Sequence, residues 1–125
     1  MPTIVHFEIP ADDIERTMNF YREIFGWKFE KCAGPMDYWL ITTTNEQGEN
    51  AMMGGVIKRQ HPQHTIINYI DVPSADEYAK KIEALGGKIL VTKTLVPETG
   101  YFVICMDTEK NVFAIWEQIC NKAKQ

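Results

Sequence analysis

The amino-acid sequence predicts an α+β fold in which two βαβββ modules follow one another along the chain. Two observations predict this fold. The order of one strand, one helix and three strands occurs twice, and the two predicted helices end at glycines, Gly26 and Gly87, about half the chain length apart. The chain has 125 residues, which is the length of one ordinary domain. We therefore interpret residues 1–125 as a single domain, with a first module over about residues 1–60 and a second over about residues 61–125.

The first predicted strand covers residues 3–9, whose side chains alternate between two faces. One of these faces is apolar and carries Val5, Phe7 and Ile9. The other face is mixed and includes His6 and Glu8. This alternation is typical of a strand whose two faces meet different surroundings.

Each module then has a predicted helix that begins at a capping residue. Asp12 and Asp13 both offer N-caps, and Asp12 and Glu15 have the spacing of a capping box, ahead of a helical pattern over residues 14–25. Ser74 and Glu77 repeat this spacing in the second module. The two helices therefore follow the first strand of each module at matching positions.

The remaining predicted strands are short β-rich segments bounded by turn formers. They cover residues 27–31, 37–43 and 51–58 in the first module, and residues 65–72, 88–92, 101–107 and 112–118 in the second. Gly34-Pro35 marks a turn, and the residues from Cys120 to Gln125 look like a solvated end. Gly54-Gly55 lies inside a predicted strand, where glycine is typical of a bend or a close backbone approach.

One helix covers one face of a four-stranded sheet and leaves the other face exposed. We expect each helix to lie on the outer, apolar face, so that the mixed inner faces of the mixed sheets curve around a groove. Strand parity directs three groups of side chains to this inner face: His6 and Glu8, then Ile67, Tyr69 and Asp71, then Val112, Ala114 and Trp116.

Three further pairs of residues can contribute to the inner face, and the pattern does not decide between their members: Met52 or Met53, Tyr38 or Trp39, and Tyr101 or Cys105. A groove lined by aromatic side chains and methionine suits a small hydrophobic or aromatic molecule. We predict five ligand-binding residues: Ile67, Tyr69, Ala114, Trp116 and Met52. Cys105 has no basic neighbour in sequence, and we expect it to pack in the core.

Composition excludes several classes of function. The net charge of −4 and the pI near 5.3 disfavour binding to nucleic acid. No apolar run is long enough to cross a membrane, and the start does not resemble a signal peptide, so we expect a cytoplasmic protein. The three cysteines are widely separated, which indicates neither a disulfide framework nor a zinc ribbon.

Four segments together resemble the vicinal oxygen chelate superfamily, which includes glyoxalase I, bleomycin- and fosfomycin-resistance proteins and extradiol dioxygenases. They are Val-His-Phe-Glu-Ile-Pro-Ala-Asp-Asp (5–13), Asn-Phe-Tyr-Arg-Glu-Ile-Phe-Gly-Trp (19–27), Gly86-Gly87 and Asp-Thr-Glu-Lys-Asn-Val-Phe (107–113). Thr108 and Lys110 depart from the usual last motif. The resemblance covers nearly the whole chain and implies paired βαβββ modules and, commonly, a homodimer.

The resemblance also implies a divalent metal in glyoxalase-like members, held by side chains on the first and last strand of each module. Its first ligand falls on His6, which matches. Two others fall on Ile67 and Ala114, which carry no lone pair, and the fourth falls near residues 52–54, where there is no carboxylate. A single imidazole binds a divalent ion too weakly for a catalytic site. We therefore expect no metal site and no cofactor.

Two functions remain from the sequence. In the first, the chain is a metal-independent lyase or isomerase that acts by proton transfer on a small carbonyl or aromatic compound. His6 is then the base and Glu8 orients it, and a nearby carboxylate is expected to raise the imidazole pKa. In the second, the chain binds a drug or metabolite without transforming it, as the resemblance to bleomycin-resistance proteins implies. His61 and His64 are interpreted as two solvated loop residues.

Overall fold

The computed structural model describes residues 1–33 and 37–119. Within these residues the chain forms two compact units. His6–Ile66 form the N-terminal unit, and Met1–Val5 with the chain from Ile67 onwards form the C-terminal unit.

Two sequence predictions lie outside the described residues. These are the turn at Gly34-Pro35 and the solvated end from Cys120 to Gln125. In the part of the chain that is described, no helix is long and apolar enough to span a membrane.

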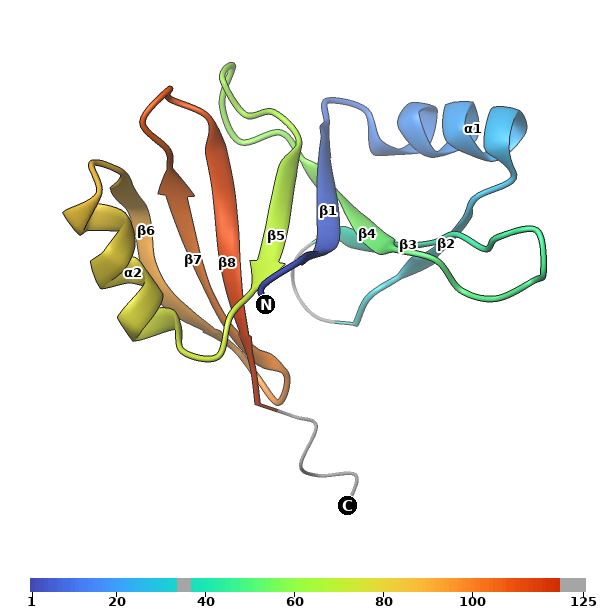
Figure 1. Cartoon of the computed structure of the whole chain (residues 1–125). Coiled ribbons are helices and arrows are strands. Elements are labelled where there is room, and N and C mark those ends of the chain that lie inside the picture. Colours follow the sequence, from blue (N-terminus) through green and yellow to red (C-terminus); the bar gives the residue numbers. More distant parts are fainter. Residues whose placement is uncertain (34–36, 120–125) are drawn as a thin grey trace. The chain divides into compact units, whose positions relative to one another are not determined.

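The N-terminal unit has one helix and the strands of one sheet, as Figure 1 shows. Its elements are β1 (Ile4–Ala11, of which the part from His6 belongs to this unit), α1 (Ile14–Phe25), β2 (Lys28–Lys31), β3 (Tyr38–Thr42) and β4 (Met53–Lys58). The strand order is β2-β3-β4-β1. β1 pairs with β4 in parallel, whereas the pairs β2–β3 and β3–β4 are antiparallel.

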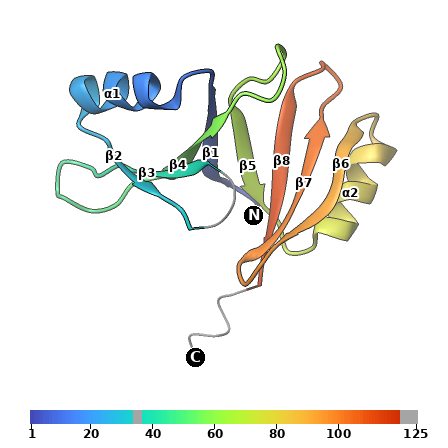
Figure 2. The ribbon, with the colours of Figure 1, turned by 180° about the vertical axis from the view of Figure 1, so that it is seen from behind.

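The C-terminal unit repeats this plan. Its elements are β5 (Ile67–Asp71), α2 (Ala75–Ala84), β6 (Lys88–Val96), β7 (Gly100–Met106) and β8 (Val112–Gln118). The strand order is β5-β8-β7-β6, with a parallel β5–β8 pair and antiparallel β7–β8 and β6–β7 pairs. Figure 2 shows α2 beside these strands from behind. The predicted fold class, α+β with two βαβββ modules in tandem, is therefore confirmed.

The N-cap of α1 is Asp13, which is one of the two predicted candidates, and not Asp12 of the capping-box spacing. The Asp13 side chain accepts a hydrogen bond from the backbone N–H of Arg16 at 3.0 Å. Asp12 instead accepts a hydrogen bond from the Arg59 guanidinium. Arg59, which is far from Asp12 in the sequence, therefore holds the Asp12 carboxylate. Gly26 ends α1 at φ 72°, as predicted.

The start of α2 is as predicted, because the Ser74 side chain accepts a hydrogen bond from the Glu77 N–H at 3.2 Å. Gly86, at φ 100°, turns the chain after this helix. The following strand β6 is longer than predicted. It continues past residue 92 as far as Val96, because Val96 still pairs with Gly100 on β7.

Each helix covers the apolar face of its own sheet. In the N-terminal unit the buried core consists of Ile9, Ala11, Met18, Ile41 and Val56. In the C-terminal unit it consists of Val72, Ala75, Val103, Cys105 and Ile115. The face that the helix of a unit does not cover is called the uncovered face of that unit below.

Cys105 packs in the core, as expected, and burial raises the pKa of its thiol to about 11. Tyr101 has the same strand parity as Cys105. The Lys93 ammonium lies over the Tyr101 ring and also pairs with Asp76 on α2, so this ring is on the helix side. The prediction that Tyr101 or Cys105 contributes to the inner face is therefore wrong.

We expect the substitution Ile41→Ala to lower the free energy of unfolding by about 2–5 kcal/mol, because it leaves a cavity among buried side chains. Ile41 has no exposed surface, whereas Ile66 is 54% exposed. Ile66→Ala is therefore the matched control, and urea unfolding measures both. Equal losses in the two variants would contradict the proposed core.

Candidate functional site

The uncovered face of the N-terminal unit brings together both residues that the sequence predicts as catalytic. His6 and Glu8 lie on β1 with the same parity, opposite the core residues of that strand. Their register partners on β4 are Met53 and Gly55. Leu40 on β3 pairs in turn with Gly55, so β3 adds its own side chains to the same face.

A hydrogen bond joins His6 to Tyr38. The Nε2 atom of His6 and the Oη atom of Tyr38 are 2.9 Å apart. These residues lie on β1 and β3, which are separated by β4, so the tyrosine ring has to cross a whole strand. Gly55 makes this crossing possible, because a Cβ atom at that position would collide with the hydroxyl end of the Tyr38 ring.

The neighbouring glycine serves the opposite face. A Cβ atom on Gly54 would lie 2.7 Å from the Phe7 ring, which packs against the core under α1. Both glycines therefore permit close approach of an aromatic ring to β4. The close approach predicted for Gly54-Gly55 is confirmed. The sequence did not predict that the approaching side chains are Phe7 and Tyr38.

Burial lowers the pKa of His6 below its ordinary value of 6.5. The predicted direction, a pKa raised by a nearby carboxylate, is therefore wrong. Burial removes water from around the ring, and this disfavours the charged imidazolium. The half-buried His6 ring is consequently neutral at pH 7.

Two of the open alternatives are decided by strand register. Met53 is the register partner of His6, whereas Met52 precedes β4 and is 43% exposed. The place that the sequence analysis gave to Met52 is thus held by Met53. Tyr38 lies on the uncovered face, whereas Trp39 packs against the core.

The uncovered face of the C-terminal unit carries the other predicted ligand-binding residues. Tyr69 and Asp71 on β5 are opposite Ala114 and Trp116 on β8. Ile67 begins the same strand with the same parity and is 7% exposed. The predicted parity of these strands is confirmed, and ligand binding by these residues stays a prediction.

Trp116 is held in place on this face. Its indole ring lies over Gly100, where a Cβ atom would be 2.7 Å from the ring. Its Nε1 donates a hydrogen bond to the Gln118 side chain at 3.3 Å. Asp71 has a structural task, because its carboxylate accepts a hydrogen bond from the backbone N–H of Thr3 at 2.9 Å.

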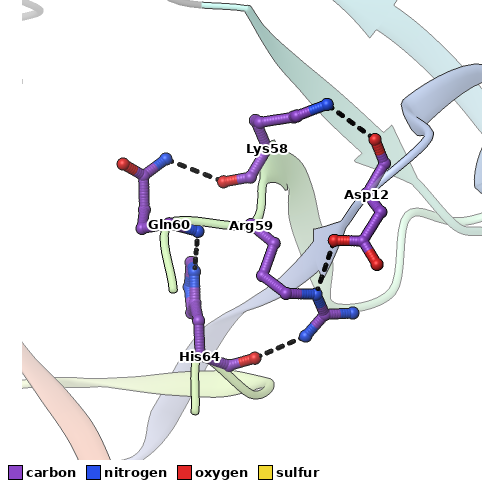
Figure 3. Close-up of polar contacts among 5 residues, drawn as sticks. All are labelled: Asp12, Lys58, Arg59, Gln60 and His64. Carbon is purple, nitrogen blue, oxygen red and sulfur yellow. Dashed lines mark hydrogen bonds and ion pairs between the residues drawn. The ribbon is translucent and has the colours of Figure 1, made fainter. Parts of the chain in front are cut away.

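His64 is not a solvated loop residue, which corrects the sequence interpretation. It is 8% exposed, and its Nδ1 accepts a hydrogen bond from the backbone N–H of Gln60 at 3.1 Å (Figure 3). An accepting Nδ1 places the proton on Nε2 of a neutral ring. Burial, His61 and Arg59 all lower the pKa of His64. His61, by contrast, is exposed as expected.

The segment around His64 is fixed by Asp12. Arg59 donates to the Asp12 carboxylate at 3.0 Å and to the His64 carbonyl at 2.6 Å. Figure 3 shows both contacts. Lys58 donates to the Asp12 carbonyl at 2.7 Å. These hydrogen bonds hold the segment from Lys58 to His64 against Asp12, so we assign the cluster a structural task.

The side chains do not fit the divalent metal that the resemblance implies. Among residues 1–33 and 37–119, no three His, Cys, Asp or Glu side chains are placed to hold an ion. His6 bonds to a phenol, and the positions of two further ligands are the hydrocarbon side chains of Ile67 and Ala114. No chemical step is therefore assigned to a metal.

We expect Gly55→Ala to displace the Tyr38 ring and break its hydrogen bond to His6. The ring signals of His6 in proton NMR should then shift, and the free energy of unfolding should fall by roughly 1–3 kcal/mol because the face is overpacked. Tyr38→Phe, which keeps the ring and removes the hydroxyl, should shift the same signals with a smaller loss of stability. Unchanged His6 signals in both variants would exclude the contact.

We also expect the free energy of unfolding to fall as the pH drops from about 7 to about 5.5. The pKa values of His6 and His64 are lowered in the folded state, so the unfolded chain binds more protons below pH 6.5. Urea unfolding at several pH values measures this slope. His6→Gln should make it shallower, with His61→Gln as the matched control at an exposed position. A flat profile for the unsubstituted chain would contradict the burial argument.

The fold is similar to that of several solved enzymes. A variant of Streptomyces coelicolor methylmalonyl-CoA epimerase in complex with 2-nitronate-propionyl-CoA has a TM-score of 0.68 and 12% identity, covering 92% of this chain and 96% of its own. Methylmalonyl-CoA epimerase from Mycobacterium tuberculosis has a TM-score of 0.65 and 8% identity, covering 98% and 91%. At these identities the likeness shows the fold.

Sequence comparison identifies the family. A glyoxylase-like domain-containing protein of Didymella fabae is 33% identical over 112 residues, which are 86% of this chain and 88% of that protein. The family model described as Glyoxalase/Bleomycin resistance protein/Dioxygenase superfamily matches residues 3–115. With its two βαβββ units and this match over nearly its whole length, the chain belongs to the glyoxalase/bleomycin resistance protein/dioxygenase superfamily.

Proposed function

We propose that the chain is a metal-independent enzyme that transfers a proton on a small carbonyl or aromatic compound, as a lyase or isomerase. One observation carries this proposal. The imidazole of His6 is half-buried, has a lowered pKa, and is fixed by Tyr38 on an uncovered sheet face. A neutral, positioned imidazole is the general base that proteins use most often near neutral pH.

His6 acts as the base in this proposal. The hydrogen bond between His6 and Tyr38 orients the ring, and the imidazole takes a proton from an acidic C–H of the substrate. The electron pair of that bond moves into the adjacent carbonyl group to form an enolate. Return of the proton to the other face or to a neighbouring carbon gives an isomer, and loss of a leaving group gives the product of a lyase. The Tyr38 contact is kept in both protonation states of the ring.

Glu8 lies two residues beyond His6 on the same face of β1. We assign it the task of orienting the imidazole and favouring the imidazolium that forms during the reaction. The similarity in fold to proteins named epimerases supports the isomerase class, because epimerisation is an isomerisation.

A second candidate function is binding without chemistry. It is favoured by the apolar character of the other uncovered face, where the Trp116 indole is partly exposed beside Ala114. Such a surface offers hydrophobic contact to a drug or metabolite and has no need of a base. Turnover distinguishes this function from the first.

We expect the protein to exchange the acidic C–H protons of its substrate for deuterium in D₂O. The probes are small aldehydes, alkyl ketones and aryl ketones, and proton NMR follows the loss of each signal. His6→Gln should slow this exchange by about 10²–10⁴-fold, the usual contribution of a general base. His61→Gln is the matched control and should exchange at the original rate.

Binding of the same probes is measured in parallel by thermal shift, since a ligand that binds only the native state raises its melting temperature. His6→Gln should keep this shift if His6 serves catalysis. Stabilisation by a probe that the unsubstituted protein never exchanges would contradict the proposed reaction and support the binding function. Exchange that survives His6→Gln would exclude His6 as the base.

A further inference from the structure

A cavity of about 370 Å³ opens beside the first two turns of α1, within the N-terminal unit. Its lining residues come from the end of β1 and from α1: Ile9, Pro10, Arg16, Thr17, Phe20 and Tyr21. His6, Glu8 and Tyr38 do not line it, so the cavity is distinct from the candidate functional site. Pockets for small molecules have volumes of about 300–1,000 Å³. This cavity is at the lower end of that range and suits a small ligand.

Two aromatic rings form one wall of the cavity. The ring centroids of Phe20 and Tyr21 are 5.3 Å apart, and the ring planes meet at 90°. Two rings at a right angle offer a flat ligand one face to stack on and a second ring to meet edge to face. Phe20 is 56% exposed, although large apolar side chains are usually buried. On the β1 side, Ile9 and Pro10 are buried and apolar. The lining therefore favours an aromatic ligand.

The Tyr21 ring is held in place by the protein itself. It stacks on the Trp27 indole, with ring centroids 4.9 Å apart and ring planes 5° from parallel. Trp27 packs in turn against the core of the N-terminal unit. A ring that is fixed in this way loses little further entropy when a ligand binds against it. One wall of the cavity is thus already ordered for contact with a flat molecule.

Arg16 is the charged residue among those that line the cavity. It lies four residues before Phe20 and therefore on the same side of α1. Within the residues that the structure describes, its guanidinium forms no hydrogen bond and no ion pair. The nearby carboxylates have other partners, because Asp12 accepts from Arg59 and Asp13 caps the helix. A guanidinium in this state can bind a carboxylate through two parallel N–H···O hydrogen bonds.

We propose that the cavity beside α1 binds a small aromatic carboxylate. The ring of the ligand stacks on Tyr21 and meets Phe20, and its carboxylate accepts hydrogen bonds from the Arg16 guanidinium. Thr17 adds a hydroxyl group to the same lining. Arg16 and Phe20 are exposed, so the ion pair is in contact with water and contributes modestly. The dissociation constant is therefore in the high micromolar to millimolar range. The site is independent of the proposed proton transfer.

The probes are phenylacetate and its neutral analogue phenylacetamide, which has nearly the same shape. Amide NMR spectra of the ¹⁵N-labelled full chain, recorded up to about 10 mM of each probe, cover the expected dissociation constants. The amide signals of Thr17, Phe20 and Tyr21 should shift and saturate. Phenylacetate should bind about fivefold more tightly than phenylacetamide, which is the most that an exposed ion pair usually contributes. Arg16→Gln should remove this preference.

Arg22→Gln is the matched control, because it removes the same charge from the same helix outside the cavity lining, and it should keep the preference. Phe20→Ala should weaken the binding of both probes about threefold or more, as loss of an aromatic contact does. Circular dichroism confirms that each variant is folded. Equal affinity for the two probes, a preference that survives Arg16→Gln, or shifts confined to the strands around His6 would each overturn the proposal.

Discussion

In a four-stranded sheet with one helix, the face under the helix needs apolar side chains, whereas the other face can also carry polar ones. Both units follow this constraint. Under α1 the sheet contributes Ile9 and Val56, which are almost fully buried. Because the core needs only that face, β1 can carry His6 and Glu8 on its other side without burying a charge in the core. The candidate chemistry of the protein therefore depends on where the helices lie, although no helix contributes to it.

Glycines on the uncovered faces let aromatic rings approach the backbone of a neighbouring strand closely. Tyr38 crosses β4 over Gly55, and Trp116 lies over Gly100. In both cases the glycine has no Cβ atom, so the ring contacts the backbone directly. The consequence at Tyr38 is chemical, since it brings the hydroxyl to His6. A ring fixed in this way also costs little further entropy when a ligand binds against it.

Burial, rather than charge pairing, is the main influence on the pKa values of His6 and His64. Both His6 and His64 have lowered pKa values, and desolvation is the largest cause in each case. Their tasks nevertheless differ. The Nδ1 of His64 closes a turn by accepting from a backbone N–H, whereas His6 meets a phenol on an uncovered face. The imidazole of His64 already serves the backbone, which makes it a poor choice for proton transfer.

Local pattern was sufficient for the order of the elements, the caps at Ser74 and Gly26, and the parity of β1, β5 and β8. Each of these depends on residues a few positions apart, and strand and helix periods are properties of the backbone itself. Local pattern left two choices open. At the first helix cap, Arg59 engages Asp12 and Asp13 is the N-cap. At the start of β4, Met53 and not Met52 is beside His6.

By itself, then, the sequence determined two βαβββ units, a hydrocarbon face for each helix and a mixed face that carries His6 and Glu8. Only the tertiary structure decided that Tyr38 reaches His6 over Gly55, that His64 is buried and that the pKa of His6 falls. The reason is that burial and the register between strands depend on segments that are distant in the chain, so the pattern within one segment cannot predict them.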